Sequence, residues 1–149
     1  MSIVSELLDH KGRNVWSISA DSTVYEAVLL MSEKNVGALV VTSDSSKLAG
    51  IISERDYARS VVLNGKSSKS TLVSEIMTED VVFAKEDTLL ERCMNLMAQK
   101  KIRHLPIVDR QGPVGMITSG DIMKTIIKEQ SMTIEELETF MFVDEGGEG

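Results

Sequence analysis

The sequence predicts an α/β (α+β) fold of two tandem βαββα repeats with pseudo-twofold symmetry, the sheets packed against each other and the helices outside. Three observations predict this fold. The chain repeats itself at a nearly constant offset, and each copy changes its hydrophobic periodicity in the same order. In addition, a chain of 149 residues leaves each half too small to be stable alone, so the halves must cover each other.

The repeat is visible by direct alignment. Asp-Ser-Thr-Val at residues 21–24 aligns with Asp-Thr-Leu-Leu at residues 87–90, an offset of 66. Gly-Ile-Ile-Ser at residues 50–53 aligns with Gly-Met-Ile-Thr at residues 115–118, an offset of 65, so the second copy has one residue fewer in a turn. A lead-in recurs as well, because Val-Ser-Glu-Leu-Leu begins at Val4 and Val-Ser-Glu-Ile-Met begins at Val73. The first copy has three more residues between its lead-in and its first strand.

Each copy shows the same order of elements. Short β-prone runs at 15–19 and 81–84 are followed by Ser or Thr beside an acid, which caps a helix N-terminus. Apolar residues then recur at the i, i+3, i+4 spacing of a buried helical face, and Cys93 is one of them. The remaining elements are paired strands at 36–42 and 48–52, paired strands at 102–109 and 114–117, and helices at 56–63 and 121–129.

Three parts of the chain follow from this pattern. Residues 1–66 form the first repeat with its lead-in, and residues 67–130 form the second repeat. Residues 131–149 form a C-terminal helix and an acidic tail. In this last part Ile134, Leu137, Phe140 and Met141 make an apolar stripe after a Thr133 cap, and the stripe packs on its own core or on a partner chain.

Composition excludes several classes of protein. Sixteen Lys and Arg against 23 Asp and Glu give a net charge of −7, so we expect no nucleic-acid or membrane partner. A single cysteine excludes an intrachain disulfide and a multi-thiolate zinc site. No apolar run has the length of a membrane span, and residues 1–11 do not resemble a secretory signal. We therefore expect a cytoplasmic protein, or a protein of an organelle matrix if a targeting segment has been removed.

One polar pattern recurs at the end of each repeat: Gly, two apolar residues, Ser or Thr, two variable residues, and Asp. It gives the pairs Ser53 with Asp56 and Thr118 with Asp121. A hydroxyl residue three positions before an acid is the ordinary signature of a helix cap, and physical chemistry alone favours that interpretation. The alternative is that the carboxylate accepts hydrogen bonds from ribose hydroxyls, while the hydroxyl and the helix N-terminus hold a phosphate.

At this point the sequence resembles a known family, the CBS domain, named after cystathionine β-synthase, whose members occur as tandem pairs. The pattern ending at Asp56 and Asp121 resembles the family's ribose-binding signature. Ile-Arg-His-Leu-Pro-Ile-Val at 102–108 is similar to the family's apolar-x-x-Leu-Pro-Val strand. The resemblance covers about residues 4–129. The first copy departs from it with Val40 at the position of Pro106, which we expect to alter only a strand kink.

The resemblance implies two nucleotide sites, each built from the Ser or Thr and the Asp of one repeat and from strand residues of the other. The first site would use Ser53, Arg55, Asp56, Val82, Phe83, Ala84, Ile102, Arg103 and His104. The second site would use Ile18, Ser19, Ala20, Val36, Gly37, Ala38, Thr118 and Asp121.

The two implied sites differ in charge. Arg55, Arg103 and His104 give the first site cations for a phosphate, whereas the second site has Gly and Ala at the matching positions. The second site would hold only the nucleoside end of a ligand or stay empty. The competing interpretation makes Arg103 and His104 part of a solvated basic patch with Lys100 and Lys101. Trp16, near the first strand, would shield a base or fill the core.

We therefore expect a non-catalytic regulatory module that binds AMP, ADP, ATP or NAD(H) between its repeats, senses energy or redox state, forms a homodimer and modulates a partner protein. S-adenosylmethionine derivatives are further ligand candidates. No catalytic residue, metal site or catalytic cofactor is expected, because the two histidines and the glycines match no catalytic motif. The alternatives are a structural or dimerisation adaptor with empty clefts and a nucleotide hydrolase that uses Asp56 or Asp121.

Overall fold

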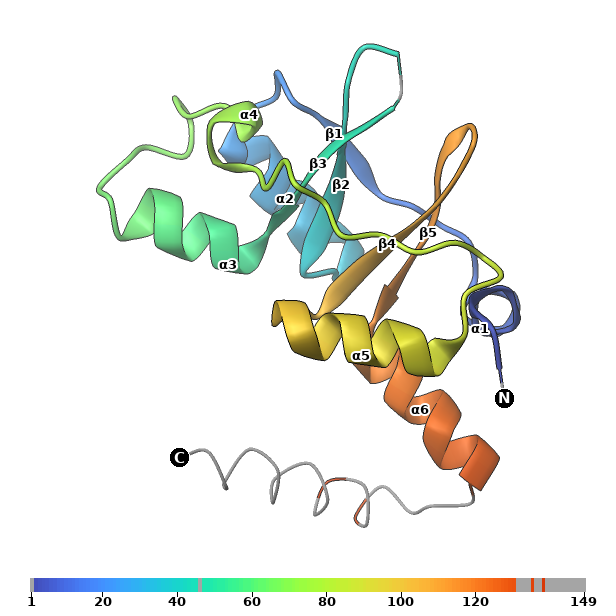
Figure 1. The fold of residues 1–149 in the computed structure, drawn as a ribbon. Helices are drawn as coiled ribbons and strands as arrows, with labels where there is room; N and C mark the ends of the chain where they lie inside the picture. The colour runs from blue at the N-terminus through green and yellow to red at the C-terminus, as the bar shows by residue number, and fades with distance from the viewer. Residues whose placement is uncertain (1, 46, 131–134, 136–137, 139–149) are drawn as a thin grey trace.

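The computed structural model describes residues 2–45, 47–130, 135 and 138. The predicted apolar stripe of the C-terminal helix lies outside these residues. Two small sheets lie at the centre, with helices on the outside (Figure 1). This arrangement agrees with the predicted fold class. Among the described residues, no helix combines the length and the apolar character that crossing a membrane requires.

The first repeat is a three-stranded sheet with helices beside it. β2 (Ala38–Thr42) is the middle strand, parallel to β1 (Ser17–Ser19) and antiparallel to β3 (Leu48–Ser53). Thr23 caps α2 (Val24–Lys34) by accepting a hydrogen bond from the Glu26 backbone N–H at 3.2 Å. After β3 the chain forms α3 (Glu54–Tyr57), which continues as the π-helical turn η1 (Ala58–Val62). The predicted order of elements is confirmed here.

The second repeat has the same order but one strand fewer. β4 (His104–Asp109) and β5 (Gly112–Thr118) form an antiparallel pair. α5 (Leu90–Lys100) precedes this pair and α6 (Ser119–Gln130) follows it. The predicted strand at 81–84 is reduced to a single bridge, in which Ala84 pairs in parallel with Ile107.

Pro106 gives the physical reason for this lost strand. In the first repeat, the Val40 N–H donates to the Trp16 carbonyl at 3.2 Å and so extends the pairing of β1 with β2. Pro106 stands at the position of Val40 and has no N–H to donate to Val82, the counterpart of Trp16. Val40 therefore allows a longer strand pairing in the first repeat than Pro106 allows in the second. The expectation that this difference alters only a kink is wrong.

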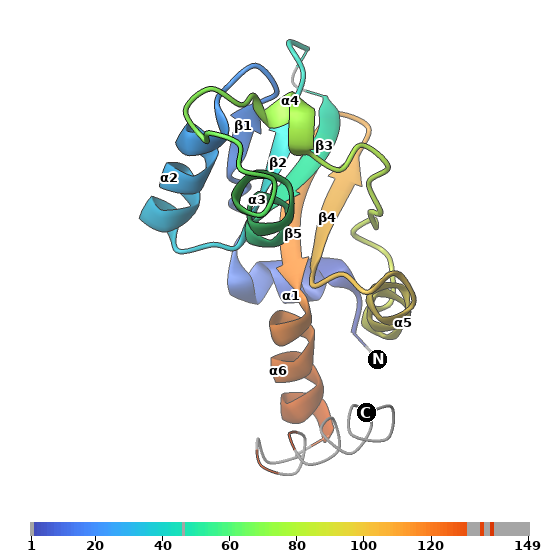
Figure 2. The ribbon, with the colours of Figure 1, turned by 90° about the vertical axis from the view of Figure 1, so that its left-hand side faces the viewer.

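The lead-in segments exchange between the repeats. α1 (Val4–Lys11) precedes the first repeat, yet its buried Val4, Leu7 and Leu8 belong to the core of the second repeat. α4 (Val73–Ile76) precedes the second repeat, yet Val73 and Ile76 belong to the core of the first. Figure 2 shows α1 beside α6 and α4 above the first sheet. Each core is therefore completed by a segment that lies next to the other repeat in the sequence.

Two glycines of the repeated motif allow this exchange. A Cβ on Gly50 would lie 2.8 Å from both the Met77 sulfur and the Thr78 carbonyl oxygen. A Cβ on Gly115 would lie 2.9 Å from the two methyl groups of Leu8. Leu8 and Met77 occupy the same place in the two lead-ins, so the glycines make equivalent contacts. The motif glycine is thus required for packing, whatever the function of the acid that follows it.

We predict that both Gly50→Ala and Gly115→Ala destabilise the fold, by about 1–3 kcal/mol, because each overpacks a closed contact. Gly50→Ala is expected to cost more, since its Cβ meets a backbone carbonyl, whereas Gly115→Ala meets only side-chain methyl groups that can rotate. Urea unfolding of the two variants measures the difference. Equal stability of both variants and the wild type would show that the lead-ins are not packed as described.

Candidate functional site

A cleft of about 620 Å³ lies between the two repeats. The first repeat contributes the end of β3 and the start of α3, the second contributes the segment that joins α5 to β4, and the chain after α4 closes one side. The lining residues are Gly37, Ile51, Ser53, Glu54, Arg55, Asp56, Thr78, Asp80, Val81, Val82, Lys100, Lys101, Ile102, Arg103 and His104. The structure therefore brings together most of the first predicted site.

Asp56 caps the helix and also faces the cleft. Its Oδ2 accepts hydrogen bonds from the Ser53 backbone N–H at 2.9 Å and from the Ser53 hydroxyl at 3.1 Å. The Ser53 hydroxyl in turn accepts from the Asp56 N–H at 3.2 Å, which completes a capping box. Within the described part of the chain, Oδ1 accepts no hydrogen bond and no cation lies within 4 Å of the carboxylate. The cap therefore fixes the carboxylate and leaves one oxygen free to accept from a ligand.

The cleft is lined by four cations and by the three acids Glu54, Asp56 and Asp80, in a chain that is acidic as a whole. Lys100, Lys101 and Arg103 come from the second repeat, and Arg55 comes from the first. The Arg55 guanidinium donates to the Lys101 carbonyl at 3.5 Å, a long contact that joins the repeats. Lys101 ends α5 in the left-handed conformation with φ of 55°, which holds this turn at the mouth of the cleft. A phosphate entering the cleft would meet these cations.

The pKa of His104 is shifted against the charge that the sequence-based expectation assigns to it. Burial lowers the pKa of the His104 imidazole below its usual value, and Lys11 and Arg103 lower it further against the opposing effect of Glu54 and Asp121. This shift disfavours the charged imidazole, and the role of His104 as a cation for a phosphate stays a prediction. Gly37 packs closely against it, since a Cβ on Gly37 would lie 3.2 Å from His104 Nε2.

Two residues predicted for the first site lie outside the cleft lining. The side chain of Ala84 is buried in the core of the second repeat, and its backbone pairs with β4 through Pro106 and Val108. Phe83 is exposed. Thr78, Asp80 and Val81 line the cleft without having been predicted. The recurrence of the lead-in was the only sequence signal that pointed to this segment.

The residues predicted for the second site are not gathered in the same way. Ile18, Ala20 and Val36 pack against the core of the first repeat, and Ala38 is buried. The Ser19 hydroxyl accepts from the Asp21 N–H at 3.2 Å, and Gly37 lines the first cleft. Thr118 and Asp121 form a cap like that of the first repeat, with Thr118 N–H donating to Asp121 Oδ2 at 2.8 Å.

Asp121 carries an ion pair that Asp56 lacks. The Lys11 ammonium lies 2.6 Å from Asp121 Oδ2 and also donates to the Met116 carbonyl at 2.5 Å. Although burial by itself would raise the pKa of Asp121, hydrogen bonds from Lys11 and Thr118 hold this pKa below its usual value. The carboxylate is therefore charged and paired within the protein.

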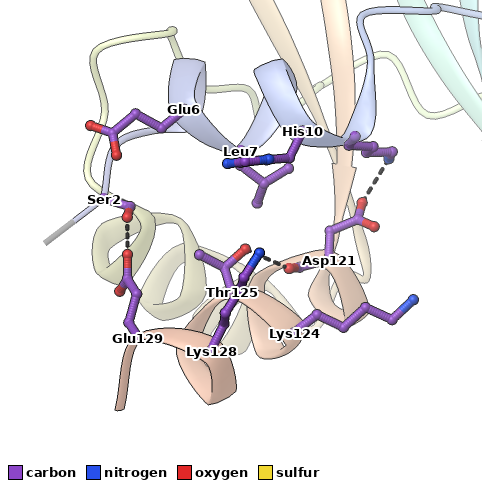
Figure 3. A pocket seen from close by; sticks show the side chains of 10 residues that line it. Ser2, Glu6, Leu7, His10, Asp121, Lys124, Thr125, Lys128 and Glu129 are labelled. Carbon is purple, nitrogen blue, oxygen red and sulfur yellow. Dashed lines mark hydrogen bonds and ion pairs between the residues drawn. The ribbon is translucent and has the colours of Figure 1, made fainter. Parts of the chain in front are cut away.

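The pocket that Asp121 lines is a groove of about 440 Å³ between α1 and α6. Figure 3 shows Asp121 and Thr125 of α6 facing Leu7 and His10 of α1. A hydrogen bond from the Ser2 hydroxyl to Glu129 closes one end of this groove. The groove lies on the α1–α6 surface and not between the two sheets.

Trp16 and Cys93 both lie outside the cleft lining. The Trp16 ring is partly exposed and lies under the Lys34 ammonium, 4.3 Å from the ring centroid, so the indole neither fills the core nor lines the described cleft. Cys93 is fully buried, and burial raises the pKa of its thiol to about 11, in agreement with a core residue. No group of three or more His, Cys, Asp or Glu side chains is placed to hold a metal ion in the part of the chain that the structure describes.

Two repeats with exchanged lead-ins and a cleft between them define a tandem-repeat module. The chain belongs to the CBS domain family, because the family model matches residues 4–63 and again residues 73–128. Such CBS domain pairs are in general regulatory, non-catalytic modules.

Relatives and solved structures agree with this membership. The chain is 37% identical over 147 residues to the mitochondrial CBS domain-containing protein CBSX3 of Arabidopsis thaliana, covering 93% of this chain and 71% of that protein. A putative signal-transduction protein with CBS domains from Burkholderia ambifaria is 41% identical, with a TM-score of 0.82 over 89% of this chain and 99% of that one. The CBS domain pair of protein MJ0100 was solved with methylthioadenosine and S-adenosylmethionine; it is 26% identical, with a TM-score of 0.77 over 87% of this chain and 98% of that one.

The ion pair between Lys11 and Asp121 should make the stability of the fold depend on pH in the acid range. A carboxyl group whose pKa is lowered in the folded state stabilises the fold above its unfolded pKa of about 4, and this stabilisation is lost as the pH falls through the folded pKa. We therefore expect Lys11→Met to lower the melting temperature at pH 7 and to have a smaller effect near pH 3. Thermal melts of wild type and variant across this range measure the difference, and a pH-independent difference would contradict the assignment.

Proposed function

We propose that this protein binds an adenine nucleotide in the cleft between its repeats and transmits its presence to a partner protein without catalysing a reaction. The observation that supports this function best is the juxtaposition in one cleft of the capped Asp56, with a free carboxylate oxygen, and the cations of the facing repeat. A carboxylate suits ribose hydroxyls, and Arg103 suits a phosphate. A nucleotide carries both groups on one molecule.

The choice among ligands follows from charge and size. A volume of about 620 Å³ falls within the usual range for small-molecule pockets. Four cations among the lining residues, against the three acids Glu54, Asp56 and Asp80, favour a phosphorylated ligand over the unphosphorylated adenosine derivatives bound by the pair of protein MJ0100. We therefore propose AMP, ADP or ATP as the ligand class, with NAD(H) and S-adenosylmethionine as competitors in the same binding assay.

Regulation would follow from the position of the cleft. A ligand that contacts Asp56 in one repeat and Arg103 in the other stabilises one relative arrangement of the repeats, by its difference in affinity for the two arrangements. The output would be a change at the surface that a partner protein or a second copy of the chain contacts. We propose that this signal reports cellular energy or redox state, and that the chain acts as a homodimer. We propose that the protein works in the cytoplasm or in an organelle matrix.

The two alternative functions make different predictions in simple assays. An adaptor with empty clefts would show no rise in melting temperature with any nucleotide, whereas a bound ligand stabilises the native state by mass action. A hydrolase would release phosphate from ATP.

We predict that Asp56→Asn lowers the affinity for AMP at least tenfold, because hydrogen bonds to a charged group contribute about 1.5–3 kcal/mol. The measurement is the AMP-induced shift in melting temperature, followed by calorimetric titration. Glu75→Gln is the matched control, since Glu75 caps α4 by accepting from the Leu72 N–H at 2.7 Å and does not line the cleft. Undiminished affinity of the Asp56 variant would refute the ribose assignment.

A second prediction separates phosphate from nucleoside recognition. Arg103→Gln should weaken AMP binding by about 10-fold to 100-fold, because one charge-assisted hydrogen bond is lost, and should leave adenosine binding nearly unchanged. Arg110→Gln, in the turn between β4 and β5, removes the same charge away from the cleft and should change neither affinity. An equal loss for AMP and adenosine would assign Arg103 a structural role.

A further inference from the structure

The two repeats carry the same capped acid but different residues beside it. By the register of the lead-ins, the position of Lys11 in the first copy corresponds to Asp80 in the second. This register also holds in space, since Leu8 packs on Gly115 as Met77 packs on Gly50. Asp80 lines the first cleft together with Asp56, whereas Lys11 is paired with Asp121. The exchanged lead-ins thus deliver an acid to one motif and a cation to the other.

The placement of Lys11 is fixed from two sides. Its ammonium is held by the Met116 carbonyl on β5 and by Asp121 at the start of α6, so it spans the turn from strand to helix. Its side chain is 35% exposed and that of Asp121 is 21% exposed, so solvent screens the pair in part. Both the ammonium and the Thr118 N–H reach Oδ2 of Asp121.

We propose that Lys11 acts as a built-in occupant of the second nucleotide motif, an inference that rests on the nucleotide-binding function proposed above. The ammonium bonds to Oδ2 of Asp121 and neutralises the carboxylate, so the remaining Oδ1 is a weaker acceptor for ribose hydroxyls than Oδ1 of Asp56, which has no ion pair with a described residue. One repeat therefore binds ligand at Asp56, and the other is closed at Asp121. Lys11 is a residue that determines the number and class of ligands bound.

Ligand class at the opened site follows from its neighbours. The counterpart of Arg103 is Gly37 and that of Arg55 is Gly120, so the second motif lacks these two cations, and the remaining lysines of its groove are Lys124 and Lys128 of α6. With Lys11 removed, the Asp121 motif would recognise a ligand by its ribose, so adenosine should bind there as well as AMP. The first site, in contrast, would prefer AMP.

The experiment counts bound ligand by equilibrium dialysis with labelled AMP and labelled adenosine. The wild type is expected to bind one AMP per chain, and Asp56→Asn is expected to bind AMP at least tenfold more weakly. Lys11→Met should bind two ligands per chain when adenosine is at saturation. Lys11→Met combined with Asp56→Asn should retain one, which is lost again when Asp121→Asn is added. Lys85→Met is the matched control, since Lys85 lines neither the cleft nor the α1–α6 groove and makes no ion pair with a described residue.

The outcomes separate the two proposals. If AMP binding of the wild type is undiminished by Asp56→Asn, the proposed function fails at its site, whatever Lys11 does. If Asp56→Asn weakens binding but the Lys11→Met and Asp56→Asn double variant binds neither AMP nor adenosine, the role of Lys11 is refuted. Lys11→Arg keeps the cation and should leave the second motif closed, so it tests the charge even if the methionine variant is less stable. Melting temperatures of all variants confirm that they are folded.

Discussion

The exchange of lead-in segments is the constraint on which the rest of the molecule depends. Leu8 fills the core of the second repeat against Gly115, and Met77 lies against Gly50 in the first, so neither repeat has a complete core without the other. The same exchange carries the chain past each core to the start of a helix. Residues 78–82 reach the cleft at Asp56, and Lys11 reaches Asp121. Packing and ligand recognition therefore share one topological cause.

The residues that make the two repeats alike in fold are not the residues that make their two candidate sites different. The glycines, the capping hydroxyls and the two acids are the same in both repeats, and they fix where the helices begin. The differences lie in the residues near the acids. The first copy has Lys11 where the second has Asp80, and it has Gly37 where the second has Arg103. Duplication thus supplies two equivalent carboxylates, and a few substitutions decide which of them is open to a ligand.

Much of this could be read from the sequence, because the repeat and its periodicity are local patterns. The order of elements and the caps at Ser53 and Thr118 follow from them, whereas the presence of Asp56 and Arg103 in one cleft was implied only by the resemblance to the CBS domain family. Three features could not be read in this way. The exchanged lead-ins are long-range packing that periodicity does not encode, the lowered pKa of His104 depends on its burial, and the Lys11 ion pair joins residues that are far apart in the sequence. The shortened strand at Ala84 was readable in principle, since it follows from the missing N–H of Pro106.

The most direct test of the central claim, that ligand bridges the repeats at one of the two acids, is a crystal structure of the chain grown with AMP. We expect one nucleotide per chain, with its ribose hydroxyls bound to Asp56 and its phosphate beside Arg103. Lys11 should still be bonded to Asp121. A nucleotide whose ribose lies on Asp121, or one that contacts a single repeat, would contradict it.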